Sequence, residues 1–275
     1  MDYYSTMLQR SSCRNYESRP IPKELHLKLR QIISCSPSSG GFQNYSVIHV
    51  ASEETKKKIS RLCRRQGFIA SAPSLYVFCL DLHRERRIAE SYSIPPCMNF
   101  DHINLMMLTI DAAIAAQNLC TAAELEGLGS CYIGNILNNI REVSDILSLP
   151  EQTMPVIMVT LGYPASHNAP SDKYGADILV HEEAYQELPL ETLQEAWKEK
   201  YASWKMKPNN KLLSKIRKVS TESFGEKYAD KGIAYITENN LVDPYSFWNA
   251  FYYSDTEDID SIDVFTEYLR DKKLL

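Results

Sequence analysis

Apolar and polar residues follow each other in short periodic blocks along the first 165 residues of this 275-residue chain. A helix is predicted from Pro22 onward, because Leu25, Leu29, Ile32 and Ile33 fall on one helical stripe. Strands are predicted at residues 45–50, 75–80, 130–133 and 154–161. The 75–80 run is apolar throughout, which indicates a strand that is buried on both faces. The alternation of helices and strands predicts three layers around one sheet.

The longest predicted helix runs from Asp101 to Glu126 and is rich in alanine, so that neighbouring elements can pack close to it. Gly127 and Gly129 follow directly and end this helix. A shorter, basic helix is predicted over residues 53–65. The first 165 residues therefore contain the segments that would build a single layered domain.

The pattern changes after Leu188. An amphipathic helix is predicted from Leu190 to Trp204, Pro208 breaks it, and shorter helical pieces follow. We therefore divide the chain into a domain of residues 1–188 and a helical C-terminal extension of residues 189–275. The acidic residues near the end are expected to form a solvated tail, since they lack the glycine and glutamate spacing of a calcium loop: Asp255, Glu257, Asp258 and Asp260.

Composition excludes several classes of protein. Apolar residues make up 44% and charged residues 24%, which is ordinary for a soluble globular protein. The net charge of −5 argues against a general nucleic-acid binder, which needs concentrated positive charge. The longest apolar stretch, Leu105 to Ala116, is too short to span a bilayer and contains Asp111. With no secretory signal at the N-terminus, we expect a cytoplasmic protein without a membrane partner.

The cysteines and histidines do not form a recognisable metal site or nucleophile. The seven cysteines include no C-x-x-C pair and have no neighbouring histidine, so zinc and iron–sulfur spacings are absent. Reduced thiols in the cytosol fit this pattern. Neither a G-x-S-x-G elbow nor an H-E-x-x-H motif occurs. Catalysis by a protein nucleophile or a metal therefore has no candidate.

Two polar clusters could meet a ligand. Arg10-Ser11-Ser12-Cys13-Arg14 brackets two hydroxyls with two guanidiniums, which suits a phosphate. The alternative is a surface turn with salt-bridged arginines. The loop at residues 37–43, with Ser38, Ser39 and two glycines, could approach a polar ring, or could simply connect a helix to a strand. The amide of Gln66 offers both a donor and an acceptor to a heterocycle.

The third cluster is glycine-rich and spans Gly127 to Asn135. It contains G-x-G, but it follows a helix and leads into a strand, whereas a dinucleotide-binding fingerprint needs the order strand, glycines, helix. A Rossmann site is therefore excluded. The alternative is a helix C-cap followed by a tight start to a strand.

Taken in order, these clusters resemble the FMN-dependent nitroreductase family. The resemblance rests on residues 10–14, the helix from Pro22, residues 37–39, residues 127–134 and the Leu161-Gly162-Tyr163-Pro164-Ala165 segment. Residues 178–186 narrow it to the oxygen-insensitive NADPH nitroreductases and NADPH–flavin oxidoreductases. The similarity covers about residues 5–190. It implies an α+β fold with three α/β/α layers, whose central sheet is mostly antiparallel.

The resemblance also implies a cofactor and an assembly. Residues 1–188 would bind FMN tightly but noncovalently at the interface of an intertwined homodimer, and the extension of residues 189–275 would wrap the partner. Ser38 and Ser39 would reach the flavin across that interface. The implied FMN-binding residues are Arg10, Ser11, Ser12, Arg14, Ser38, Ser39, Gln66, Tyr132, Ile133, Gly134, Asn135 and Lys173.

By the same resemblance, the chain takes hydride from NAD(P)H as co-substrate and reduces nitroaromatics, quinones or free flavin by a ping-pong mechanism. The chemistry would occur at flavin N5, so no catalytic side chain is expected. The sequence departs from the subgroup where Ser171 and Asp172 replace Lys and Pro, and where Asn135 replaces Gly. These departures leave an alternative open: a flavin-binding storage, sensor or partner-docking protein with little turnover.

Overall fold

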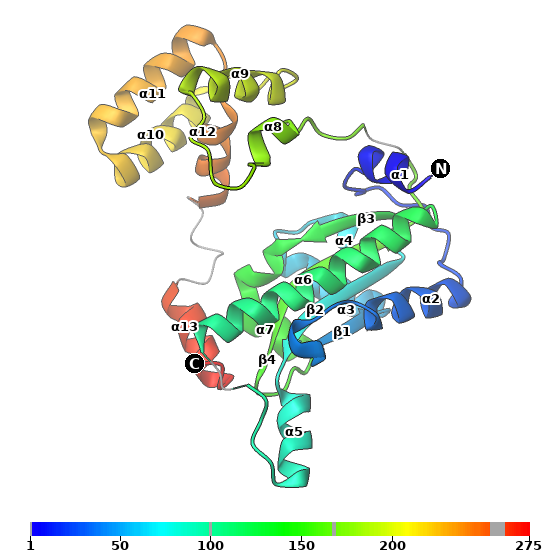
Figure 1. Ribbon diagram of the computed structural model, residues 1–275. Coiled ribbons are helices and arrows are strands. Elements are labelled where there is room, and N and C mark those ends of the chain that lie inside the picture. Colours follow the sequence, from blue (N-terminus) through cyan, green and yellow to red (C-terminus); the bar gives the residue numbers. More distant parts are fainter. Residues whose placement is uncertain (1, 99–100, 167–168, 254–261) are drawn as a thin grey trace. The chain divides into compact units, whose positions relative to one another are not determined.

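Four antiparallel strands form the sheet at the centre of the fold: β1 (Tyr45–Val50), β2 (Ser74–Asp81), β3 (Gly129–Ile133) and β4 (Thr153–Gly162). They lie in the order β1-β2-β4-β3 (Figure 1). The structure is a computed structural model that describes residues 2–98, 101–166, 169–253 and 262–275. All four strands predicted from the sequence are confirmed. Every residue of β2 is buried, as the continuous apolar run indicated.

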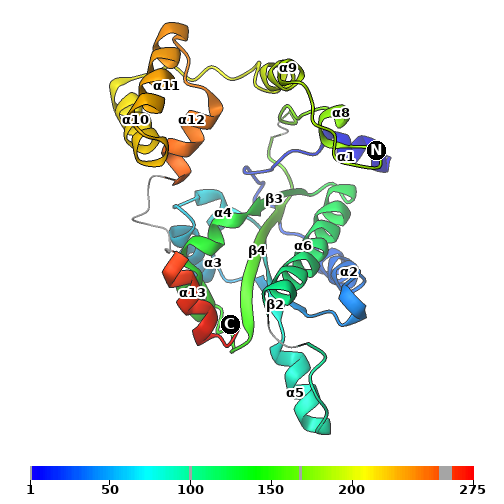
Figure 2. The ribbon, with the colours of Figure 1, turned by 60° about the vertical axis from the view of Figure 1, so that its left-hand side comes forward.

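Helices cover both faces of the sheet. α2 (Lys23–Ser34) and α6 (His102–Leu125) share a core with one face, and α3 (Glu53–Leu62), α4 (Gly67–Ser71) and α7 (Ile140–Ile146) share a second core with the other. Successive residues of β2 alternate between these two cores, because strand side chains point to opposite faces. Figure 2 shows the strands between these two groups of helices. The α+β fold with three layers is thereby confirmed.

α6 is the central helix of this unit. The Asp101 carboxylate caps its start by accepting a hydrogen bond from the Asn104 N–H, and Gly127, with a φ of 77°, follows its end. Among the described residues, α6 is the one helix with the length and apolarity of a membrane span. It nevertheless packs on the sheet and carries Asp111 in the core, as a helix of a soluble domain does.

The same unit contains α1 (Tyr3–Gln9), α5 (His83–Tyr92), α13 (Ile262–Asp271) and the 3₁₀ turns η1 (Ser39–Gly41) and η2 (Gly134–Asn139). α13 joins it although residues 189–275 were assigned to the extension. The Tyr268 hydroxyl lies 2.8 Å from the Ser144 Oγ, and the Gln152 N–H donates to the Lys272 carbonyl. By its internal contacts this unit comprises Met1–Pro170 and Asp258–Leu275.

The second unit, Ser171–Glu257, is helical. It contains α8 (Ala176–Leu179), α9 (Leu190–Lys200), α10 (Asn210–Phe224), α11 (Glu226–Asn239), α12 (Pro244–Trp248) and the π-helical turn η3 (Asn249–Tyr253). Its small core is formed mainly by Leu212, Ile216, Ile236 and Val242.

Two predicted helices end earlier in the structure than in the sequence pattern. α3 ends at Leu62 rather than residue 65, because Arg64 and Arg65 take left-handed backbone conformations with φ near 54° and 53°. α9 ends at Lys200 rather than at Trp204. The Trp204 side chain lies against another segment of the second unit, where its indole N–H donates to the Val242 carbonyl at 2.7 Å. The predicted acidic tail, Asp255, Glu257, Asp258 and Asp260, lies outside the described residues.

Candidate functional site

The segment of residues 10–17 runs in extended form past the ends of β3 and β4. The Cys13 N–H donates to the Ser130 carbonyl at 2.9 Å, and the Glu17 N–H donates to the Tyr163 carbonyl at 2.9 Å. The Tyr16 hydroxyl donates to the Cys13 carbonyl at 2.7 Å. These bonds fix the arginine–serine cluster beside the strand that carries the glycine-rich cluster, although more than a hundred residues separate them in sequence.

Two glycines allow this close approach. A Cβ on Gly129 would lie 2.6 Å from the Cys13 Cβ, and a Cβ on Gly162 would lie 2.7 Å from the Tyr16 Cδ1. Real Cβ contacts are longer than this, so any larger residue would push the segment away. The glycines of the sequence motifs thus serve to bring two backbones together at this point.

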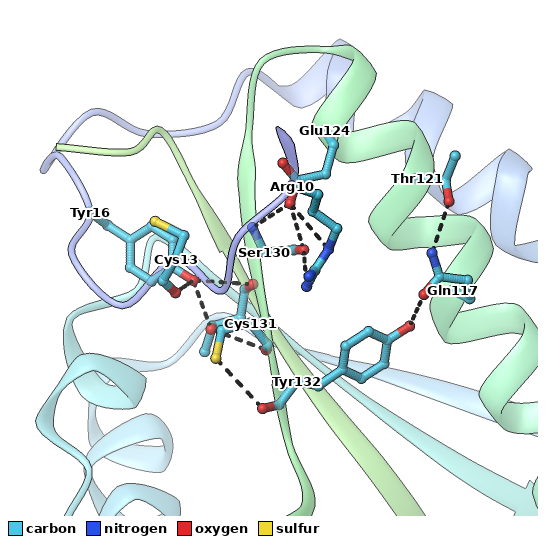
Figure 3. A network of polar contacts seen from close by, with 10 residues as sticks. Arg10, Cys13, Tyr16, Gln117, Thr121, Glu124, Ser130, Cys131 and Tyr132 are labelled. Atoms are coloured by element: carbon cyan, nitrogen blue, oxygen red, sulfur yellow. Dashed lines mark hydrogen bonds and ion pairs between the residues drawn. The ribbon is translucent and has the colours of Figure 1, made fainter. Parts of the chain in front are cut away.

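Arg10 is held by a buried polar network (Figure 3). Its Nη2 donates to the Ser130 Oγ at 3.3 Å, and its Nε lies 3.7 Å from the Glu124 Oε1. Glu124 Oε1 also accepts hydrogen bonds from the Ser130 N–H at 3.1 Å and from the Ser130 hydroxyl at 2.7 Å. Burial raises the pKa of the Glu124 carboxyl, while Ser130 and the Arg10 charge act in the opposite direction.

The other members of the first cluster lie next to this network. Arg14 is exposed, and its guanidinium carbon lies 6.0 Å from the centre of the Phe68 ring. Burial raises the pKa of the Cys131 thiol on β3, and the charges of Arg14 and Arg10 together with the Ser12 hydroxyl oppose that effect, so both arginine charges act at this strand. A cavity of about 480 Å³ is lined by residues that include Arg10, Ser11 and Gly129.

Gln66 and Asn135 meet from two separate segments. The Gln66 Nε2 donates to the Asn135 Oδ1 at 3.1 Å and to the Cys63 carbonyl at 3.0 Å. Within the part of the chain that the structure describes, the Gln66 Oε1 and the Asn135 Nδ2 therefore remain as an acceptor and a donor for a ligand. Gly134 connects β3 to Asn135, and a Cβ added to it would meet no atom within 4 Å. The space beside Gly134 is therefore open to a ligand.

Tyr132 and Ile133 complete the candidate residues on β3. Ile133 is buried in the core shared with α3, α4 and α7. Tyr132 is half-buried, and its hydroxyl donates to the Gln117 Oε1 on α6 at 3.1 Å. Burial raises the pKa of the Tyr132 phenol, so it stays neutral at physiological pH. Only the backbone of Ile133 is thus available for contact with a ligand, whereas Tyr132 also offers part of its ring.

Three of the predicted residues lie elsewhere. In the described part of the chain, the contacts of Ser38 and Ser39 join their loop to α6 and to itself: the Ser39 N–H donates to the Asp111 carboxylate at 3.0 Å, and Ser38 Oγ accepts from the Gln43 N–H. Lys173 belongs to the second unit and is exposed. Nine of the twelve predicted residues therefore lie on β3 or beside it, and three do not join them within the first unit.

The arrangement around β3 fits the phosphate and the polar edge of FMN. Among the described residues the buried Arg10 Nε makes no hydrogen bond, because its ion-pair partner, the Glu124 Oε1, lies 3.7 Å away, so the guanidinium keeps donor capacity for an anion. Two serines and a second arginine adjoin it on the same extended segment, and hydroxyls and guanidiniums are suitable partners for phosphate oxygens. The amides of Gln66 and Asn135 and the open space at Gly134 provide for a polar ring.

Sequence reasoning missed Glu124, Ser130 and Phe68. Ser130 lies inside the glycine-rich cluster, so its place in that cluster could have identified it as a candidate site residue. Glu124 lies in the last turn of α6, where the helix dipole disfavours a negative charge. An acid at such a position indicates a tertiary partner, which the structure identifies as Arg10 and Ser130. Phe68 carries no signal in the sequence pattern.

Comparison with known proteins gives a consistent result. The profile of the nitroreductase family matches residues 7–163. The chain is 31% identical over 181 residues to the Bacillus subtilis protein named FMN reductase (NADPH), covering 66% of this chain and 73% of that protein. It is 30% identical over 210 residues to the NADPH-flavin oxidoreductase of Vibrio harveyi, covering 76% of this chain and 85% of that protein.

A solved structure shows the same fold over nearly the whole length. NfrA1 of B. megaterium superposes with a TM-score of 0.73 at 27% identity, covering 98% of both chains. This similarity therefore includes the helical second unit as well as the sheet.

Proposed function

This chain belongs to the nitroreductase family, and on that basis we propose that it is an FMN-dependent oxidoreductase. It takes reducing equivalents from NAD(P)H and reduces nitroaromatics, quinones or free flavin. The observation that carries the proposal is the cluster beside β3, where Arg10 and Ser11 line one cavity, Ser12 and Arg14 follow on the same segment, and the Arg10 Nε makes no hydrogen bond among the described residues. The names of the two curated relatives, FMN reductase and NADPH-flavin oxidoreductase, support the same activity.

In this proposal the residues of the chain bind and orient. Arg10, Arg14 and the hydroxyls of Ser11 and Ser12 hold the phosphate through charge-assisted hydrogen bonds. Gln66 and Asn135 meet the polar edge of the ring, and the backbone from Tyr132 to Gly134 lies along it. When bound there, FMN would supply the redox chemistry that links oxidation of NAD(P)H to reduction of the second substrate. No side chain has to act as acid or base.

The cofactor is tested by its identity and stoichiometry. The purified protein should release close to one FMN per subunit on denaturation, identified by mass spectrometry and quantified by absorbance. Released FAD, or a protein that takes up no flavin after reconstitution, would contradict the assignment. Riboflavin added in parallel provides the control, because it lacks the phosphate that the Arg10–Arg14 segment is proposed to hold.

Turnover separates the enzyme from a flavin-binding protein that only stores or senses flavin. Visible spectra of the holoprotein are recorded before and after anaerobic addition of NADPH and of NADH. An enzyme loses its yellow colour within the mixing time and regains it when a quinone is added. A spectrum that stays unchanged with both nucleotides would favour the storage or sensor alternative. The comparison also measures which nucleotide is preferred.

The proposed enzyme is a homodimer, and α6 supplies the argument. One side of this helix packs on the sheet, while Ile103 (73% exposed), Met106 (66%) and Ile110 (47%) form an apolar stripe on the other side. Exposed apolar stripes of this kind indicate a partner surface. The loop of Ser38 and Ser39 is tied to the same helix through Asp111. Pairing through α6 would therefore bring that loop toward the flavin of the partner.

In the complete assembly the second unit wraps the partner subunit and Lys173 adds a cation near the phosphate. The dimer interface should bury more than roughly 2,000 Å², as obligate interfaces do. Sedimentation on dilution should show no monomer that keeps its flavin, because assembly and flavin binding are linked. A monomer that retains FMN and oxidises NAD(P)H would contradict this arrangement. The proposed location is the cytoplasm, where thiols stay reduced, since all seven cysteines are free in the structure.

A further inference from the structure

Glu124 is a buried acid that the proposed reaction does not use. Its side chain is 12% exposed, and it lies in the last turn of α6 at the end of the helix that disfavours negative charge. Among the described residues, the polar contacts of this carboxylate fall on one oxygen, Oε1, which faces the Ser130 N–H, the Ser130 hydroxyl and the Arg10 Nε (Figure 3). Tertiary contacts therefore hold this carboxylate in place against the helix dipole.

Ser130 links Glu124 to Arg10 through two hydrogen bonds of its hydroxyl group. Ser130 is fully buried, and its hydroxyl proton is directed to Glu124 Oε1 at 2.7 Å. The lone pairs of the same hydroxyl accept from the Arg10 Nη2 at 3.3 Å. One carboxylate thus holds the Arg10 guanidinium in two ways. It forms an ion pair with Nε, and it is linked to Nη2 through the Ser130 hydroxyl. Fixed in this way, the guanidinium loses little conformational entropy when it binds an anion.

The Glu124 carboxylate also lowers the net positive charge around Arg10. Among the described residues, the polar side chains in contact with Arg10 are Glu124 and Ser130. An ion pair in partly buried surroundings offsets much of the arginine charge as seen by a third group. The same residue that orients Arg10 therefore weakens its attraction for a phosphate.

We propose that Glu124 is a positioning residue for Arg10 in the phosphate subsite, and that its negative charge limits how tightly the phosphate of FMN is held. This inference rests on the proposed function, since it assumes that the phosphate lies at Arg10. The Glu124 side chain then has two roles. Its hydrogen bonds with Ser130 orient the Arg10 guanidinium, and its negative charge lowers the affinity for the FMN phosphate.

Glu124→Gln tests the charge alone. Because every contact falls on Oε1, the amide oxygen can keep the hydrogen bonds while the charge is removed. The holoprotein is dialysed against an equal mixture of FMN and riboflavin, and the ratio of bound FMN to bound riboflavin is measured by chromatography. This ratio isolates the contribution of the phosphate, which a merely structural change would not move. We expect it to rise about tenfold over wild type.

Two further variants make the result decisive. Ser130→Ala keeps the charge of Glu124 but removes the link to Arg10, so the ratio should fall below that of wild type. Glu126→Gln is the matched control, because this exposed neighbour pairs with Lys28 and should leave the ratio unchanged. An unchanged or lower ratio for Glu124→Gln would overturn the proposal, as would an unchanged ratio for Ser130→Ala.

The proposed function can fail separately from this inference. A wild-type protein that retains no flavin, or that binds riboflavin as well as FMN, would remove the phosphate site itself. A wild-type protein that prefers FMN, together with a Glu124→Gln variant that shows no stronger preference, would leave the enzyme assignment intact and remove only the role of Glu124.

Discussion

Acid sensitivity of the fold should depend on His49, a residue of β1 that lies outside the proposed flavin site. Its ring stacks on Tyr76 with centroids 4.6 Å apart, and its Nε2 lies 2.8 Å from the Ser74 Oγ. Its Nδ1 lies 3.3 Å from the Arg30 Nη2. Because a guanidinium can only donate, Nδ1 must be the unprotonated nitrogen. The folded structure therefore selects the neutral imidazole, whose Nε2 proton is donated to Ser74.

Burial, together with the positive charges of His26, Arg30 and Lys56, lowers the pKa of His49 from 6.5 to about 4. The unfolded chain then takes up a proton more readily than the folded protein. The resulting stability is fully present above pH 6.5 and is lost as the pH falls to about 4. The full difference corresponds to about 3 kcal/mol. Because solvent reaches part of the ring, we expect a loss of about 2 kcal/mol.

The assay is urea unfolding of wild type and His49→Gln at one protein concentration, at a series of pH values between 6.5 and about 4. Gln keeps a donor for Ser74 but does not titrate, so the variant should start less stable and then lose less stability as the pH falls. Burial also lowers the pKa of His26, whose ring centre lies 4.8 Å from that of His49, so the difference between the two proteins measures His49 together with its coupling to His26. His102→Gln, an exposed position at the start of α6, is the control. Equal pH slopes for wild type and His49→Gln would refute the reasoning.

Two further predictions concern the flavin site and its scaffold. Replacing Arg14 by Ala should weaken FMN binding by about 1.5–3 kcal/mol, which is the scale of a charged hydrogen bond, and the FMN dissociation constant measures this. An unchanged dissociation constant would show that Arg14 does not bind the phosphate and that its contact with Phe68 is structural. Replacing Gly162 by Ala should destabilise the protein by about 1–3 kcal/mol in thermal unfolding, because the new Cβ would lie 2.6 Å from the Pro73 Cδ. Gly232→Ala on α11 is the matched control, since its Cβ would meet no atom within 4 Å and helix propensity favours Ala by about 1 kcal/mol. Equal effects of the two glycine changes would show that the contact at Gly162 is not what constrains it.

The strands and the main helices of the sheet domain followed from local pattern. The bounds of β1 agree with the prediction, and α6 differs from it by one residue at each end. Such agreement is expected where burial on one or both faces imposes a strict period and where caps such as Asp101 and Gly127 mark the ends. α13 shows the limit of this reasoning. The sequence predicts only shorter helical pieces after Pro208, within the extension, and it is the contact of Tyr268 with Ser144 on α7 that joins α13 to the sheet domain.

The candidate site divides in the same way. The sequence by itself determined which residue types gather in which segments: the arginine–serine cluster, the glycine-rich cluster, and an amide at Gln66. Only the tertiary structure decided that Gln66 bonds to Asn135 and that Arg10 is paired with Glu124 through Ser130. These contacts join residues 69 to 120 positions apart. The periodicity of the sequence predicts on which face of its own helix or strand a residue lies. A contact between residues so far apart in the sequence depends on how the elements pack together.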